Sequence, residues 1–356
     1  MHKDIAVAKV SLFDNKPCSI LELYNADELP FGLRKNQEKA SRDIMLWHSK
    51  RVIPIGRINL KEIEDKLGSR EDLTMKNLGL SLTDSYWYKE EDSNLSWKDI
   101  NLFEHGFCPD FLLLKQNLLK HQTLGPDYTT NGCLEKFWIY KDHEAFLIKS
   151  GTLINESPIL AANEVVAYRI ANRMGLDAVP YKKTSIDKER FCICPSFIKS
   201  DKEEFVSLSQ IEMQLETNGD NFLVRDYLKK QGYDLYLDQL ATFTLLIHNY
   251  DCHFDNAGFI IDADTKEILR PCPLFDNGSS LNWENASVAC SNMRPFEEDL
   301  IEYANTIKSI IPLPKVSDIE HIIKDVYLEF ELSEGDIHRA IAEVNSCYEI
   351  IKDRQL

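Results

Sequence analysis

The segment from His248 to Leu281 contains the residue types that phosphoryl transfer requires. Asp251 could accept or orient the proton of a hydroxyl group. Asn256 follows five residues later, and Asp276 lies beyond an apolar, strand-like run at 257–261. Carboxylate and carboxamide oxygens are the hard ligands that Mg²⁺ prefers. Phosphoryl transfer depends on positioning and charge neutralisation and needs no covalent intermediate. One base and two metal ligands at this spacing therefore predict a phosphotransfer site.

The same residues also have a purely structural explanation. Asp and Asn are common in turns because their side chains hydrogen-bond to the nearby backbone. Asp262 and Asp264, for example, fit a hairpin turn between two strands. For Asp251, Asn256 and Asp276 taken alone, catalysis and turn formation both stay open, and the rest of the chain has to decide between them.

A lysine and a glutamate upstream favour catalysis. Lys149 ends an apolar run, Phe146–Lys149, that is typical of a strand. Glu164 follows fifteen residues later, in the expected first turn of a helix predicted at 163–174. A strand lysine paired with a helix glutamate positions the phosphates of ATP in kinases. The alternative is that Glu164 only complements the dipole of its helix.

A loop at 124–133 precedes two predicted strands at 135–140 and 145–149. Its small residues would let backbone N–H groups approach a phosphate. It is not a Walker loop, because no Gly-Lys-Ser/Thr follows. The candidate nucleotide-covering residues in this loop are Tyr128, Thr129, Thr130, Asn131 and Gly132.

The composition of the chain argues against a protein that binds nucleic acid or membranes. The chain has 356 residues, 44% of them hydrophobic, and a formal net charge of −17. An acidic surface repels phosphate backbones, so we expect no direct binding to nucleic acid. No apolar run reaches the length of a membrane span, and the first residues lack a signal-peptide layout, so we expect a cytoplasmic protein that does not bind membranes. The nine cysteines are odd in number and scattered, which predicts reduced thiols.

Hydrophobic periodicity predicts an α+β chain in three parts. Residues 1–110 form a small α+β domain of unclear role, with a hairpin at 5–24 and a helix at 34–51. Residues 111–200 are rich in predicted strands. Residues 201–356 are mostly helical, including a tail from Glu297 to Gln355 that breaks at Pro312–Val316.

Four groups of residues, in their order and spacing, resemble the HipA-like family of bacterial serine/threonine kinases. That family is distantly similar to protein kinases and phosphatidylinositol kinases. The groups are Ile148-Lys149, Asn163-Glu164 with Gly175 and Pro180 behind them, Asp251–Asn256, and Leu274–Asp276 with Ser279. The resemblance covers residues 124–290. It implies a two-lobed kinase-like fold with a mostly β N-lobe (111–200) and a mostly helical C-lobe (201–356), preceded by the small α+β domain.

The resemblance also implies roles for the site residues. Asp251 would be the catalytic base, with His253 beside it in the catalytic loop. Asn256 and Asp276 would bind Mg²⁺. Lys149, paired with Glu164, would contact the phosphates of ATP, and the loop from Tyr128 to Cys133 would cover them. In the family this loop often carries an autophosphorylated serine, for which Thr129 and Thr130 stand here. Cys194–Ser196, at the expected hinge between the lobes, departs from the family pattern.

The implied function is an ATP-dependent kinase that phosphorylates a serine or threonine of a protein substrate, as the toxin of a toxin–antitoxin pair. One alternative is a pseudokinase, an ATP-binding regulator that acts through protein–protein binding. Another is a protein whose main role is to bind a DNA-binding antitoxin, and its acidic surface fits a basic partner. A lipid kinase is disfavoured, because nothing basic in the sequence indicates an anionic membrane surface.

Overall fold

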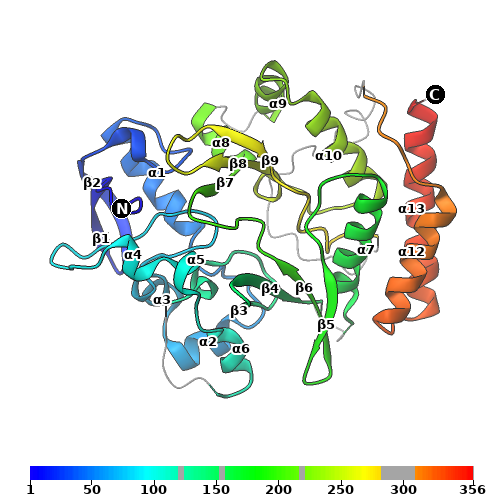
Figure 1. The fold of residues 1–356 in the computed structure, drawn as a ribbon, viewed down its shortest axis with the longest axis horizontal. Helices are drawn as coiled ribbons and strands as arrows, with labels where there is room; N and C mark the ends of the chain where they lie inside the picture. Colours follow the sequence, from blue (N-terminus) through cyan, green and yellow to red (C-terminus); the bar gives the residue numbers. More distant parts are fainter. Residues whose placement is uncertain (119–123, 152–156, 216–220, 282–308, 356) are drawn as a thin grey trace. The chain divides into compact units, whose positions relative to one another are not determined.

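The structure is a computed structural model that describes residues 1–118, 124–151, 157–215, 221–281 and 309–355 (Figure 1). The chain forms two compact units. Unit 1 comprises Met1–Ile148, Ile198–Glu216 and Phe259–Arg270. Unit 2 comprises Lys149–Phe197, Thr217–Gly258 and Pro271–Leu356. The division predicted from the sequence, into a domain at 1–110 and lobes at 111–200 and 201–356, stays a prediction.

Unit 1 begins with the predicted hairpin. Strands β1 (Ala8–Phe13) and β2 (Lys16–Leu23) pair antiparallel, with Ala8 opposite Leu23. Asp14 and Asn15 both adopt positive φ in the turn, as a tight hairpin requires. Helix α1 (Gln37–Ser49) packs on β2, and the side chain of Asn36 caps its first N–H groups. The hairpin predicted at 5–24 and the helix predicted at 34–51 are therefore confirmed.

Short helices and two further sets of strands complete unit 1. Strands β3 (Lys136–Lys141) and β4 (Glu144–Ser150) are neighbours in one sheet, and Lys149 and Ser150 at the end of β4 already belong to unit 2. Strands β7 (Glu203–Ser207), β8 (Gly258–Asp262) and β9 (Ile268–Pro271) form a sheet in that order. The Asp262 side chain accepts N–H bonds from Asp264 and Thr265, which confirms the predicted hairpin turn. The helices are η1 (Ala26–Glu28), α2 (Leu60–Leu67), α3 (Arg70–Lys76), α4 (Trp97–Ile100), α5 (Leu102–His105), α6 (Asp110–Lys115), η2 (Pro126–Thr129) and α8 (Leu208–Leu215).

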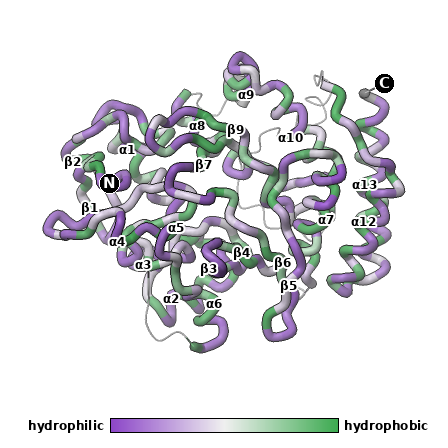
Figure 2. The backbone as a smooth tube through the Cα atoms, viewed as in Figure 1, coloured by the Kyte–Doolittle hydropathy of each residue, from purple (hydrophilic) through white to green (hydrophobic). Residues whose placement is uncertain are grey.

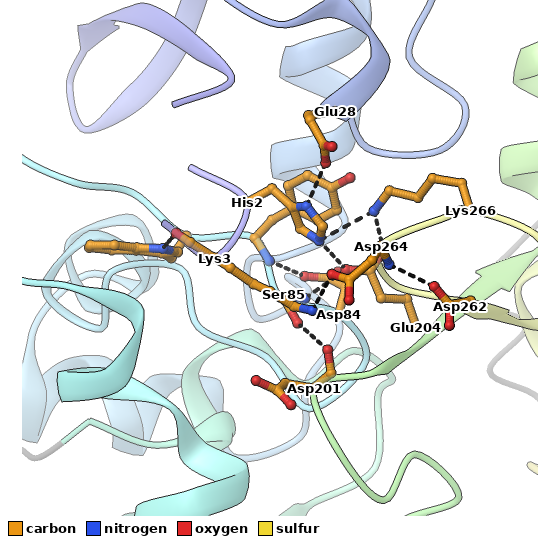
Figure 3. Close-up of polar contacts among 12 residues, drawn as sticks. His2, Lys3, Glu28, Asp84, Ser85, Asp201, Glu204, Asp262, Asp264 and Lys266 are labelled. Atoms are coloured by element: carbon orange, nitrogen blue, oxygen red, sulfur yellow. Dashed lines mark hydrogen bonds and ion pairs between the residues drawn. The ribbon is translucent and has the colours of Figure 1, made fainter. Parts of the chain in front are cut away.

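A buried polar network joins distant segments of unit 1 (Figure 3). The imidazole of His2 lies 2.7 Å from Glu28 through Nδ1 and 3.0 Å from Glu204 through Nε2. Glu204 also accepts a bond of 2.9 Å from Lys266 and one of 3.1 Å from the N–H of Ser85. Because every member has a partner, this network stabilises the packing of β7 and the β8–β9 turn against the start of the chain.

Unit 2 contains a hairpin and a group of helices. Strands β5 (Lys182–Ile186) and β6 (Glu189–Pro195) pair antiparallel, and helix α7 (Ile159–Arg173) packs on both. Helix α12 (Val316–Glu329) packs on α7 and on α13 (Glu334–Gln355), which also contacts α10 (Asp234–Leu246); α9 (Asn221–Lys230) precedes α10. Figure 2 shows hydrophobic and hydrophilic residues alternating along α12 and α13, as expected of helices with one buried face. Of the predicted tail, α12 and α13 are helical, residues 309–315 are not, and residues 297–308 lie outside the described ranges. The predicted break at Pro312–Val316 falls in this non-helical segment, except that α12 already begins at Val316.

The first turn of α7 differs from the sequence prediction. The helix begins at Ile159, after Pro158, and not at Asn163. Residues 159–162 are all apolar and buried, so they show no helical period that could reveal the start of the helix. Glu164 therefore lies in the helix interior, and the explanation through the helix dipole is wrong.

The cysteines agree with the prediction of reduced thiols except at one position. Among the residues that the structure describes, seven cysteines are thiols, five of them buried. Cys133 is disulfide-bonded, so the prediction is wrong there. In the described part of the chain, no helix is both long enough and apolar enough to cross a membrane.

Candidate active site

Lys149 is the centre of the candidate site. It lies near the end of β4, and its Nζ atom forms ion pairs with Glu164 of α7 and with Asp276. The side chains of Lys149 and Glu164 are almost completely buried. Burial disfavours the charged amine, but Asp276 and Glu164 outweigh it and raise the pKa of Lys149 well above its usual value. Lys149 is therefore a fixed cation, which is the charge that a phosphate requires.

Glu164 positions a second element besides the lysine. Its Oε2 atom accepts a bond of 2.8 Å from the backbone N–H of Asn277. Burial raises the pKa of this carboxyl and Asp276 adds to the effect, whereas Lys149 opposes it. One glutamate thus holds both the lysine and the backbone next to Asp276.

The segment after Asp276 is held tightly against α7. Asp276 adopts a left-handed conformation, with φ of 58°. A Cβ atom on Gly278 would lie 3.1 Å from the carbonyl oxygen of Leu160, so a larger residue would push the segment away from the helix. Asn163 donates a bond of 3.0 Å to the Gly278 carbonyl and accepts one of 2.6 Å from the hydroxyl of Tyr327. These contacts determine where the Asp276 carboxylate lies.

The predicted catalytic loop follows α10. The backbone N–H of Asp251 donates to Asn249 Oδ1 at 3.0 Å, and Asn256 Nδ2 donates to the Asp251 carbonyl at 3.1 Å. His253 Nδ1 accepts the N–H of Asp255 at 3.2 Å and so caps the short helix η3 (Phe254–Asn256). The structure therefore brings Asp251, His253 and Asn256 together, and it gives His253 a role in holding the loop.

Two asparagines that the sequence analysis missed connect the two halves of the site. Asn249 Nδ2 donates to Asn277 Oδ1 at 3.0 Å, and both side chains are buried. A continuous chain of contacts therefore runs from Asp251 through Asn249, Asn277 and Glu164 to Lys149. Asn249 and Asn277 lie close in sequence to Asp251 and Asp276, and this closeness could have indicated them. The sequence does not show, however, which asparagine side chains face each other.

Asn256 and Asp276 are the residues of the site whose oxygen atoms could hold a magnesium ion. Asn256 uses its amide nitrogen to hold the Asp251 carbonyl, so its oxygen is the atom that can act as a ligand. Asp276 contacts Lys149 through Oδ1 and has a second oxygen, and its side chain is 38% exposed. Hard oxygen ligands of this kind suit Mg²⁺.

The predicted nucleotide-covering loop lies in unit 1, where its residues make their own contacts. Tyr128 is fully buried and donates its hydroxyl to Asp110, and the Thr129 hydroxyl donates to the carbonyl of Leu80. The guanidinium of Arg57 binds the carbonyls of Thr130, Asn131 and Gly132. The five loop residues are thus held in unit 1, whereas the other candidate residues belong to unit 2. A role of this loop over ATP stays a prediction.

Comparison with known proteins supports the fold. No family model and no curated protein matches the sequence. Among solved structures, the complex of HipA, HipB and operator DNA of the Shewanella oneidensis MR-1 toxin–antitoxin system matches with a TM-score of 0.57 and 12% identity, over 100% of this chain and 98% of the other. The proinflammatory kinase CtkA of Helicobacter pylori matches with a TM-score of 0.45 and 18% identity, over 62% of this chain and 92% of that one. The match to the HipA complex, which covers the whole chain, shows that the chain has the α+β, two-lobed kinase-like fold of HipA.

Proposed function

We propose that this protein is an ATP-dependent kinase that transfers the γ-phosphate of ATP to a serine or threonine hydroxyl of a protein substrate. One observation carries the proposal: a buried lysine is paired with a helix glutamate and with Asp276, and polar contacts join this group to the loop of Asp251. A turn-forming role for Asp251 and Asp276 alone would not require a buried cation between two carboxylates.

Each residue has a role that follows from its contacts. Lys149 would bind the phosphates of ATP, and Glu164 would hold the lysine in place. Asn256 and Asp276 would hold Mg²⁺, which neutralises charge on the phosphates when bound. Asp251 would accept or orient the proton of the attacking hydroxyl. All of these residues belong to one compact unit.

A protein partner of the antitoxin type forms the second part of the proposal. HipA of Shewanella oneidensis was solved together with HipB and operator DNA. For this chain, a net charge of −17 favours a basic protein partner over direct contact with DNA. A pull-down with the products of the neighbouring genes should recover such a partner. Recovery of none of them would remove this part of the proposal.

Nucleotide binding and transfer test the proposal separately. ATP with Mg²⁺ should raise the melting temperature, and ATP with a chelator should raise it less, because a ligand that binds only the native state stabilises it. Labelled ATP and a cell lysate should then yield new phosphoserine or phosphothreonine sites. Equal shifts with and without metal would refute the metal ligands. Binding without transfer would favour the ATP-binding regulator instead.

A further inference from the structure

Unit 2 contains a second group of potential metal ligands, two of which lie on a helix that the proposed phosphotransfer chemistry does not use. Glu343 and Cys347 lie on α13, and His248 is the second residue after α10. One ligand atom from each of the three residues lies within 4.8 Å of the others. Glu343 and Cys347 are four residues apart, so they lie on the same face of the helix.

We propose that His248, Glu343 and Cys347 bind one Zn²⁺ ion, with water in the fourth position. A set of one imidazole, one carboxylate and one thiolate suits Zn²⁺, which accepts nitrogen, oxygen and sulfur ligands in a tetrahedral arrangement. Mg²⁺ prefers oxygen ligands and would bind such a mixed set poorly. The proposed ion is therefore chemically distinct from the magnesium of the phosphotransfer site.

The side chains are already arranged around a common point. His248 Nδ1 contacts the carboxylate of Glu343, so this nitrogen is the ring atom that faces Glu343. The hydroxyl of Tyr250 lies 2.7 Å from His248 Nδ1 and 3.3 Å from Glu343 Oε1. With an ion bound, the Tyr250 hydroxyl would hydrogen-bond to the Glu343 carboxylate and orient it, as partners of metal ligands commonly do.

An ion pair between His248 and Glu343 explains two of the three residues but not the third. Cys347 is buried, and its Sγ atom lies within 4.8 Å of the ligand atoms of His248 and Glu343. A shared metal ion accounts for a thiol placed beside an imidazole and a carboxylate.

The position of the site links α13 to the start of the predicted catalytic loop. The carbonyl of Ile247 accepts the N–H of Leu281 at 3.0 Å, and the N–H of Tyr250 donates to Ser279 at 3.1 Å. The backbone is thus bonded on both sides of His248, at Ile247 and at Tyr250, to the segment that follows Asp276. A bound ion would hold α13 against this pair of segments. The ion site itself does not depend on the proposed kinase activity.

The test uses the full chain freed of metal and titrated with Co²⁺ and Zn²⁺. Co²⁺ should bind at one ion per chain and give a thiolate-to-metal charge-transfer band, which Zn²⁺ should remove. Cys347→Ser should abolish the band and weaken Zn²⁺ binding by more than about 100-fold. Removal of a residue that only hydrogen-bonds to a metal ligand costs at most about that much, and loss of a ligand should cost more. Tyr250→Phe should weaken binding by about 10-fold. Cys272→Ser, at another buried cysteine of unit 2, is the matched control and should bind like the parent.

A second ligand variant keeps the test decisive if Cys347→Ser does not fold. His248 has φ of 48°, a conformation that asparagine tolerates, so His248→Asn removes the imidazole and keeps the backbone. This variant should also lose tight Zn²⁺ binding. Unchanged Zn²⁺ affinity in Cys347→Ser or His248→Asn, or equal loss in Cys272→Ser, would refute the site. Both outcomes are distinct from failure of phosphate transfer, which only tests the kinase proposal.

Discussion

Asn249 donates a hydrogen bond of 3.0 Å to Asn277, and this bond joins the segment before Asp251 to the segment after Asp276. The two asparagines are 28 residues apart in the sequence and both are buried. Burial of a carboxamide is unfavourable unless its hydrogen-bonding groups are satisfied. The bond therefore keeps the proposed base and the proposed metal ligand at a constant separation.

Replacing either candidate aspartate should separate chemistry from folding. Asp251→Asn is nearly isosteric, so it should keep the fold and ATP binding but lower phosphate transfer by about 10²–10⁴-fold, because the proton acceptor is lost. Asp276→Asn should also weaken Mg²⁺ binding, since a carboxylate ligand is lost. Melting curves, nucleotide binding and labelled-phosphate transfer would check both variants. Parental transfer by Asp251→Asn would show that Asp251 is not the catalytic residue.

Asn249→Ala should show that the asparagine bond positions the site. Loss of the bond leaves Asn277 buried without that partner and should lower the free energy of unfolding by about 1–3 kcal/mol. The turnover per folded molecule should fall as well, with a smaller change in KM for ATP. Asn101→Ala is the matched control in unit 1, where this buried asparagine bonds to Asp201 at 3.0 Å. If the control loses as much turnover as Asn249→Ala, the effect is only one of stability.

Lys149→Met should destabilise the protein more than a double variant does. The single change leaves Glu164 buried without its cation, which should cost about 3–5 kcal/mol. In Lys149→Met with Glu164→Met, the buried carboxylate that the single change leaves unpaired is also removed, so part of that stability should return, although the N–H of Asn277 loses its acceptor. Both variants should lose ATP binding. Denaturant unfolding would measure the free energy of unfolding of both variants. A double variant that is less stable than the single variant would contradict this prediction.

Asp127 should make stability depend on pH. Burial raises the pKa of its carboxyl to about 7, although the N–H groups of Phe111 and Trp138 oppose the shift. In the unfolded chain the same group loses its proton near its ordinary value of 3.8. Between these values the folded state binds more protons, so the free energy of unfolding should fall as pH rises from about 4 to about 7 and then level off.

Asp127→Asn provides the measurement for this pH dependence. The variant cannot titrate at this position, so the difference in unfolding free energy between parent and variant should change across that range and be constant above it. Urea unfolding at several pH values would show this. A difference that is constant from pH 4 to pH 8 would mean that Asp127 has an ordinary pKa in the folded protein.

Autophosphorylation, if the protein carries it out, should fall on Thr129 or Thr130. The Thr129 hydroxyl is buried, and that of Thr130 accepts a bond of 2.8 Å from the indole of Trp138. A phosphate adds a charge of about −1.5 to −2, which these sites cannot accommodate, so modification should force the loop out of unit 1. Phosphopeptide mapping and protease sensitivity of the loop would check this. Phosphate found only at other residues would remove this switch.

Much of the local structure could be predicted from the sequence. The hairpin at β1 and β2, helix α1 and the turn after Asp262 follow from alternation, helical periodicity and turn residues, which act over a few neighbouring residues. The order of Lys149, Glu164, Asp251, Asn256 and Asp276 also led to the proposed chemistry, because their types and spacing suit a base, a cation and metal ligands. The beginning of α7 was missed because its first turn is uniformly apolar.

Only the tertiary structure decided which of these residues meet. Lys149 and Asp276 are 127 residues apart, and their ion pair depends on the packing of β4 and α7 against the segment at Gly278. The Asn249–Asn277 bond and the group of His248, Glu343 and Cys347 likewise join segments that are far apart in the sequence. The hydrophobic pattern of the sequence predicts which face of a helix or strand is buried. A polar contact depends in addition on which two faces the fold brings together, and the sequence pattern does not contain that information.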